Sequence, residues 1–234
     1  MPRTLASLLA AFLLMSLPAN ASYHDSRASF EGLAQEDRAT VILALIAAGD
    51  LEALALHGFT PALYKALRAF EQREGMPDDG VVDEEQLRRL GTAAADFRER
   101  IGARYYTNAQ TGARLLVPRR LFDAERQTPE GLLFTRNDGL LSLLFISFPQ
   151  SERTYDDLWR TLSGGAAGKS VIYQRRFDSR FVVTGSFRTS KFYTMMLRTG
   201  GSTTGFTFSW GAPMEGMGRK ISTFLANAFA AEQR

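Results

Sequence analysis

Cysteine is absent from all 234 residues, which excludes disulfide bonds, thiol catalysis and thiolate metal sites. Histidine occurs only twice, at His24 and His57, whereas a protein zinc centre needs at least three ligands. The residues after His57 lack histidine altogether, which argues against a Ser-His-Asp hydrolase there. We therefore expect no metal site and no cofactor, and the sequence leans away from an enzyme.

Long hydrophobic runs are also absent beyond the first residues of the chain. Residues 1–21 contain a positive charge at Arg3, an apolar run from Leu5 to Leu17 and a final Ala19-Asn20-Ala21. This pattern is typical of a cleaved secretory signal peptide, and the run is shorter than the roughly 20 residues of a membrane helix. We expect a mature chain beginning at Ser22, periplasmic or otherwise exported to the cell envelope. It would have no transmembrane segment and no nucleic-acid partner.

The charge of the mature chain is unevenly distributed. Residues 22–101 carry nine basic and fifteen acidic residues, a net charge of −6, and residues 102–234 carry eighteen and ten, a net charge of +8. Such asymmetry favours two structural units. We predict an N-terminal tail at 22–35, a helical domain at 36–95 and an α+β domain at 103–234.

Helix signals divide the predicted helical domain into three helices. Apolar residues at helical spacing indicate a first helix over 37–48. Thr60 followed by Pro61 is a favourable helix start, and Gly75 is a favourable stop. Asp83 is suited to cap a third helix. The intervening Asp79-Gly80 supplies turn-forming residues.

The stretch FTPALYKALRAFEQREGMPDDGVVDEEQLRRL resembles the small three-helix type of peptidoglycan-binding domain found in many cell-wall hydrolases and envelope proteins. The residues at matching places are Ala66, Phe70, Gly75, Met76, Asp79, Gly80, Val81 and Leu90. The resemblance implies peptidoglycan as the partner. We expect a groove between helices whose candidate ligand-binding residues are Tyr64, Arg68, Glu71, Gln72 and Asp79. One departure is Glu71, where the family usually has glutamine. The alternative is a domain that keeps this fold for docking or spacing and binds no ligand.

The second half alternates in the manner of β-strands, with helical patterns at two places. A hairpin is expected around residues 137–139, then a helix capped by Ser151, four strands between 170 and 210, and a final helix over 216–231. This order predicts an antiparallel sheet covered by helices. The fold class is therefore α+β, with a small all-α three-helix module followed by an antiparallel-sheet domain. The element order loosely resembles Mog1/PsbP-like domains.

Basic residues alternate with aromatic residues along the predicted strands of the second half. They form a candidate surface for an anionic envelope protein or lipid surface: Arg175, Arg176, Arg180, Arg188, Lys191 and Arg198. A solvated sheet face, or a dock for the acidic first half, would explain them equally.

The sequence favours an exported, non-catalytic envelope protein that binds peptidoglycan and presents its C-terminal domain to a partner. One alternative is a cell-wall hydrolase whose paired carboxylates come from Asp156, Asp157, Asp178 or Glu215. Another is an envelope regulator whose helical module no longer binds its ligand.

Overall fold

The computed structural model describes residues 22–55 and 58–232, so the predicted signal peptide and His57 lie outside the described residues. The helical half consists of α1 (Tyr23–Gly32), α2 (Gln35–Ala48), α3 (Pro61–Glu74) and α4 (Glu84–Arg100). The other half consists of β1 (Ala103–Thr107), β2 (Arg114–Pro118), η1 (Arg119–Leu121), β3 (Ala124–Thr128), β4 (Gly131–Thr135), β5 (Leu141–Pro149), α5 (Tyr155–Ser163), β6 (Lys169–Arg176), β7 (Arg180–Phe187), β8 (Ser190–Thr199), β9 (Ser202–Gly211), η2 (Ala212–Met214) and α6 (Glu215–Glu232).

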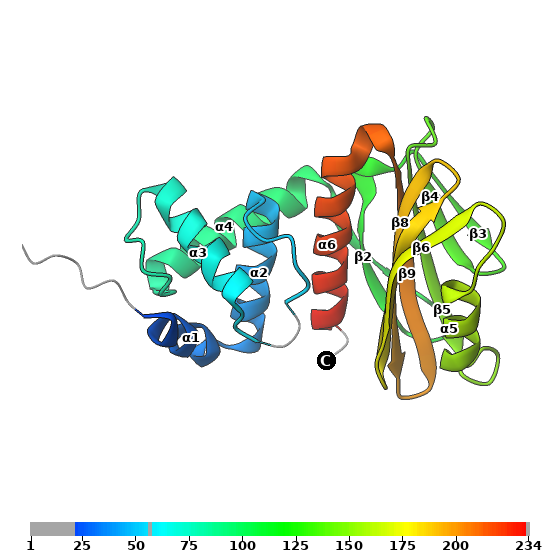
Figure 1. Ribbon diagram of the computed structural model, residues 1–234, viewed down its shortest axis with the longest axis horizontal. Coiled ribbons are helices and arrows are strands. Elements are labelled where there is room, and N and C mark those ends of the chain that lie inside the picture. The colour runs from blue at the N-terminus through cyan, green and yellow to red at the C-terminus, as the bar shows by residue number, and fades with distance from the viewer. Residues whose placement is uncertain (1–21, 56–57, 233–234) are drawn as a thin grey trace, which may run out of the picture.

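The predicted α+β class is confirmed: helices come first and an antiparallel sheet follows (Figure 1). The seven strands of this sheet are ordered β3-β4-β5-β9-β8-β7-β6, and β1 and β2 form a separate two-stranded ribbon. Helix α6 lies between the helical half and the sheet, and α5 covers the opposite face of the sheet (Figure 1). The three expected helices are α2, α3 and α4. Part of the segment expected as an N-terminal tail forms α1, which contacts α3.

The residues that the sequence predicted to begin α3 and α4, and to end α3, do so in the structure. The Thr60 hydroxyl accepts the Leu63 N–H at 3.2 Å, and Gly75 ends α3 in the left-handed region at φ 65°. Asp83 caps α4 by accepting the Gln86 N–H at 2.7 Å, and the Gln86 side chain accepts the Asp83 N–H. These bonds satisfy backbone donors that helix ends leave unpaired, so they fix where α3 and α4 begin.

One predicted cap is wrong. Helix α5 starts three residues later than Ser151 would place it, with Thr154 as its N-cap. The Thr154 hydroxyl accepts the Asp157 N–H at 3.1 Å, and the Asp157 carboxylate accepts the Thr154 N–H at 3.3 Å. This reciprocal pair needs an acidic residue three positions after the cap, and Ser151 has none there. The hairpin around 137–139, the four strands and the final helix are confirmed.

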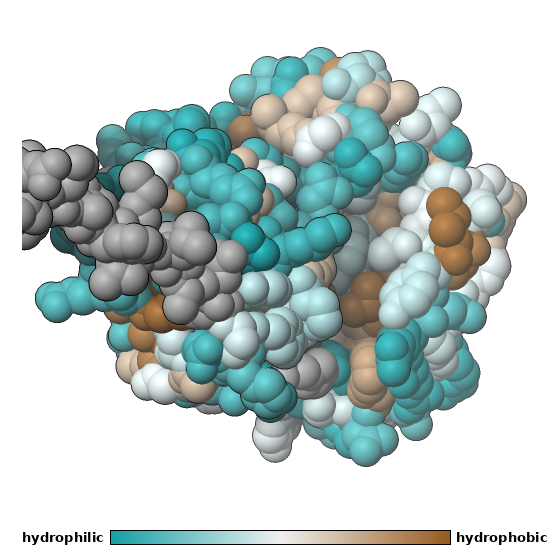
Figure 2. All heavy atoms as spheres, turned by 60° about the vertical axis from the view of Figure 1, so that its left-hand side comes forward, coloured by the Kyte–Doolittle hydropathy of each residue, from teal (hydrophilic) through white to brown (hydrophobic). Residues whose placement is uncertain are grey.

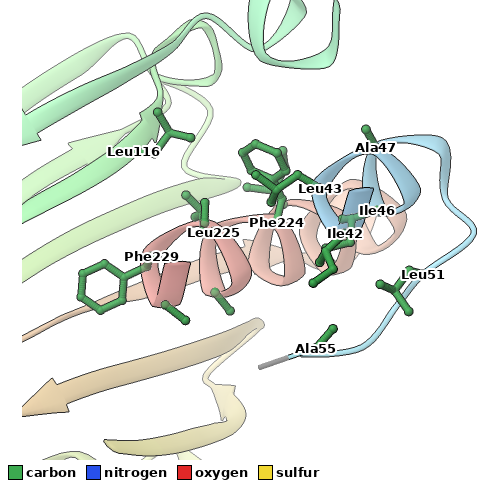
Figure 3. Packing of buried hydrophobic residues seen from close by; sticks show 14 of the residues in the cluster. Ile42, Leu43, Ile46, Ala47, Leu51, Ala55, Leu116, Phe224, Leu225 and Phe229 are labelled. Carbon is green, nitrogen blue, oxygen red and sulfur yellow. The ribbon is translucent and has the colours of Figure 1, made fainter. Parts of the chain in front are cut away.

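A single buried cluster extends from the helical half into the sheet. Ile42 and Ile46 of α2 and Phe224 and Leu225 of α6 belong to this cluster, and Leu225 lies on the side of α6 toward Leu116 (Figure 3). Asn227 of α6 accepts the Ala55 N–H at 2.9 Å and donates to the Ala53 carbonyl at 3.2 Å. Because burying these groups without partners would be costly, the contact orders the two halves relative to each other. The exact division into domains stays a prediction.

Gly218 of α6 lies close to the Trp210 ring of β9, which lets the helix pack closely on the sheet. A Cβ at this position would fall 2.2 Å from the Trp210 ring, so a side chain there would force the helix away. On the opposite face, Tyr155 and Leu158 of α5 pack on Phe181 in a smaller cluster. In the described ranges, no helix combines the length and apolar character needed to cross a membrane.

Candidate functional site

The exposed side of α3 carries an open groove of about 260 Å³. Three of the five candidate ligand-binding residues line it, namely Tyr64, Arg68 and Gln72, together with Lys65 and Ala69. All five lining residues come from successive turns of one helix. The i, i+4 spacing of Tyr64, Arg68 and Gln72 places these three side chains in a row. The groove therefore offers an aromatic ring, a guanidinium and an amide in fixed order.

Asp78, which was absent from the sequence-based candidates, organises this row. Its carboxylate accepts two hydrogen bonds from the Arg68 guanidinium, both at 2.7 Å, and a third from the Gln72 amide at 2.6 Å. The Arg68 bonds are the first cause of a pKa of Asp78 below its usual range. A bidentate arginine–carboxylate pair fixes the orientation of the guanidinium and also compensates its positive charge. The signal available in the sequence was the first aspartate of the Asp-Asp-Gly turn.

Glu71 does not line the groove but lies beneath the loop that joins α3 to α4. Its side chain is only 1% exposed, and one carboxylate oxygen accepts the Gly80 N–H at 2.8 Å. The other oxygen accepts the Gln86 amide at 3.1 Å. Burial raises the pKa of Glu71 to about 7, against the lowering effect of these hydrogen bonds. Glu71 thus holds the loop and the start of α4 in place.

Asp79 also acts on the loop itself. Its carboxylate accepts the Val81 N–H at 2.9 Å, which closes a local turn. Gly80 follows at φ 73°, and a Cβ there would lie 2.6 Å from the Tyr64 ring. Glycine is therefore required both by the backbone conformation and by the close approach of Tyr64.

Helix α1 supports the same loop through two serines. The Ser26 hydroxyl donates to the Asp79 carbonyl at 2.9 Å, and the Ser29 hydroxyl bonds both the N–H and the carbonyl of Val82. The Tyr23 ring meets the Tyr64 ring edge-on, with centroids 5.4 Å apart. The loop beside the groove is consequently held in place by α1, α3 and α4 together.

The six basic residues of the second half do not gather into one surface. Arg175, Arg176, Arg180 and Arg198 lie at one end of the strands, and the remaining two, Arg188 and Lys191, lie at the other. The first four stack on aromatic rings. Arg176 and Arg198 share Tyr155 at 5.1 and 5.3 Å, and Arg175 and Arg180 share Phe177 at 4.8 and 4.1 Å.

Three of the four carboxylates considered for a hydrolase, those of Asp156, Asp157 and Glu215, have local partners. Asp156 pairs with Arg176, and Asp157 belongs to the cap of α5. Glu215 accepts from Lys191 at 2.8 Å and from the Trp210 indole at 2.9 Å, on the opposite face of the sheet from α5. Within the described residues, no group of three or more His, Asp or Glu side chains is arranged to hold a metal ion.

Comparison with known families addresses the helical half directly. Residues 35–90 match the family model described as "Putative peptidoglycan binding domain". This segment is therefore similar to peptidoglycan-binding-type domains. The match begins at α2 and ends within α4, so it contains the groove and its loop but leaves out the supporting helix α1.

Other comparisons are less informative. No curated protein matches the sequence. Among solved structures, the solution structure of cyanobacterial PsbP (CyanoP) from Synechocystis sp. PCC 6803 is similar to the C-terminal region. It has 13% sequence identity and a TM-score of 0.41, and the similarity covers 53% of this chain and 89% of that one. At this identity and TM-score, the likeness carries no conclusion about ligand or activity.

Proposed function

We propose that this protein is an exported, non-catalytic component of the cell envelope that binds peptidoglycan through the α3 groove. The family match over residues 35–90 is the observation that carries this proposal. The C-terminal domain, which packs on the helical half through α6, would then be held at the wall.

The groove has chemistry suited to a wall stem peptide or the sugar attached to it. The Tyr64 ring offers an apolar surface, and the exposed Lys65 and Gln72 offer hydrogen-bond donors. Arg68 is already neutralised by Asp78, so it presents a fixed edge and little free charge. We therefore expect recognition by hydrogen bonds and apolar contact. Such binding falls little when salt shortens the Debye length from about 10 Å at 0.1 M to about 3 Å at 1 M.

Co-sedimentation with purified wall sacculi tests the proposal. The whole mature chain should be used, because α6 covers the buried face of α2 and an isolated helical half would expose it. We expect the double variant Lys65→Gln, Gln72→Ala to sediment much less than the unaltered protein. Arg88→Gln on α4 removes an exposed charge away from the groove and should leave sedimentation unchanged. Equal sedimentation of both variants would refute a role for the groove.

The arginine-rich end of the sheet supports a second part of the proposal, namely contact with an anionic envelope partner. Stacking on Tyr155 and Phe177 holds four guanidinium groups in place before any partner arrives. Asp156 neutralises one of them, so the attraction would be modest and sensitive to salt. The double variant Arg175→Gln, Arg198→Gln should retain sacculus binding and lose any salt-sensitive capture of anionic lipid vesicles. Vesicle binding that is absent or unchanged in this variant would remove this part of the proposal.

A further inference from the structure

A second hollow lies at the junction of the two halves, away from the α3 groove. It has a volume of about 330 Å³ and is bounded by α6, the α2–α3 connection and the strands β6, β7 and β8. Figure 2 shows the molecular face hollowed between the helical elements and the sheet. Ligand sites of small molecules commonly have this size and lie between structural units.

The sheet side of this junction cleft is aromatic and aliphatic. Tyr193 stacks on Phe206 with ring centroids 6.1 Å apart, and Trp210 stacks on Phe208 at 5.7 Å. Ile172 stands at the rim, next to a β-bulge, and is 73% exposed. A large aliphatic side chain so exposed beside two rings leaves an apolar surface facing solvent.

The junction cleft also carries four charged residues, three on its helical side and Lys191 on β8, and their charges balance. Two acids, Glu52 and Glu215, face two bases, Lys191 and Arg219. Lys191 pairs with Glu215 at 2.8 Å, but Arg219 stands 4.0 Å from Glu52 and 3.9 Å from Glu215. These distances exceed normal hydrogen-bond lengths. The Arg219 guanidinium is thus close enough to be held by both carboxylates and still able to donate to another group. The balanced lining gives no net attraction to an ion of either sign.

Two hydroxyl groups of the sheet wall lack hydrogen bonds within the part of the chain that the structure describes. Burial raises the pKa of the Tyr193 phenol, so it stays a neutral O–H over the ordinary pH range. Thr184 on the neighbouring strand β7 lines the same cleft. Both residues are partly exposed, so water satisfies these hydroxyls in the free protein and the hydroxyls of a bound molecule can replace that water.

We propose that the junction cleft binds one ring of a neutral saccharide. A sugar ring has an apolar C–H face, which suits the Tyr193 ring and the exposed Ile172 side chain, and an edge of hydroxyls that both donate and accept. This edge would bond the Tyr193 and Thr184 hydroxyls on one side and Arg219 with Glu52 on the other. A neutral ligand matches the balanced charge, whereas a phosphate or carboxylate would be attracted by Arg219 and repelled by both acids. The inference stands independently of wall binding by the α3 groove, since the two hollows share no lining residue.

The two tryptophans of the chain make the test direct, because they lie on opposite faces of the sheet. Trp159→Phe leaves Trp210 as the single indole, so its fluorescence and its indole N–H signal in NMR report on the junction cleft. Titration with maltotetraose and with chitotetraose should give a saturable change for at least one of them. Sodium phosphate and sodium acetate at equal ionic strength should give none. Ion-induced changes without a saccharide response, or no response to either saccharide at millimolar concentration, would overturn the proposal.

Substitutions then locate the binding. In the same background, Tyr193→Phe removes one hydroxyl and should weaken saccharide binding about five- to tenfold, the usual worth of one neutral hydrogen bond. Thr184→Val serves the same purpose if Tyr193→Phe lowers the thermal midpoint. Tyr105→Phe, an exposed tyrosine on β1, is the matched control and should bind like the parent. Unchanged affinity in a cleft variant with a normal midpoint would place the saccharide elsewhere and refute the assignment.

Discussion

The buried Glu71 makes the stability of this protein depend on pH in a defined direction. The pKa of its carboxyl rises from an ordinary 4.5 to about 7 in the folded chain. Between these values the folded protein holds a proton that the unfolded chain has released. The free energy of unfolding therefore falls as pH rises from about 4.5 to about 7, and it is flat with respect to this group above that range. A difference of roughly 2.5 pK units corresponds to at most about 3 kcal/mol.

Glu71→Gln removes the titration and keeps the shape of the side chain. The new amide can still accept the Gly80 N–H. Its NH2 group faces Gln86, which must turn its oxygen toward it and give up the long 3.4 Å bond from the Asp83 N–H. We expect the variant to be about as stable as the parent near pH 5 and more stable near pH 8, by up to about 3 kcal/mol. Because the variant has no proton to release at position 71, this position no longer makes its free energy of unfolding fall as pH rises.

Urea unfolding of both proteins at pH 5, 6, 7 and 8, at constant ionic strength, measures this difference. Contributions of other carboxylates cancel on subtraction, including Asp78 and Glu85, whose pKa values lie below their usual range. Glu74→Gln, an exposed substitution on the same helix, serves as the control and should follow the parent at every pH. A stability difference between Glu71→Gln and the parent that stays constant from pH 5 to 8 would refute the reasoning.

Four further outcomes are expected. Phe70→Ala truncates a buried ring of α3 and should lower the free energy of unfolding by about 3–5 kcal/mol in chemical denaturation. Gly80→Ala forces a left-handed residue and a clash with Tyr64; a loss of at least about 1–2 kcal/mol is expected, and an unchanged thermal midpoint would contradict it. Asn227→Ala leaves the buried Ala55 N–H unpaired and should cost about 1–3 kcal/mol, with unfolding still a single transition by both far-UV and tryptophan signals. N-terminal sequencing of the exported protein should begin at Ser22; a membrane fraction retaining residues 1–21 would count against cleavage.

Local signals predicted the helix ends and the strands, because a cap or a turn needs only residues close in sequence. Thr60, Gly75 and Asp83 act through neighbours no more than four positions away. The start of α5 follows the same rule, because Thr154 has Asp157 three positions later and Ser151 has no acidic residue at that spacing.

Contacts between distant segments limited the prediction of the site. Glu71 follows Leu67 by four positions and so belongs to the buried stripe of α3, but only the folded loop shows that Gly80 and Gln86 surround it. Helix α1 has few apolar residues, and it is held through serines that bond a loop 53 positions away. Strand register places four of the six basic residues at one end of the sheet and two at the other. Amino-acid composition does not determine this register.

NMR mapping of the whole mature protein with soluble peptidoglycan fragments tests wall binding through the α3 groove most directly. We predict that backbone and side-chain signals change at Tyr64, Lys65, Arg68 and Gln72, with smaller changes at Asp78. The changes should persist at 0.5 M salt, where the Debye length is roughly 4 Å. Signals that change only on the β-sheet, or that return to their free positions as salt rises, would contradict the account.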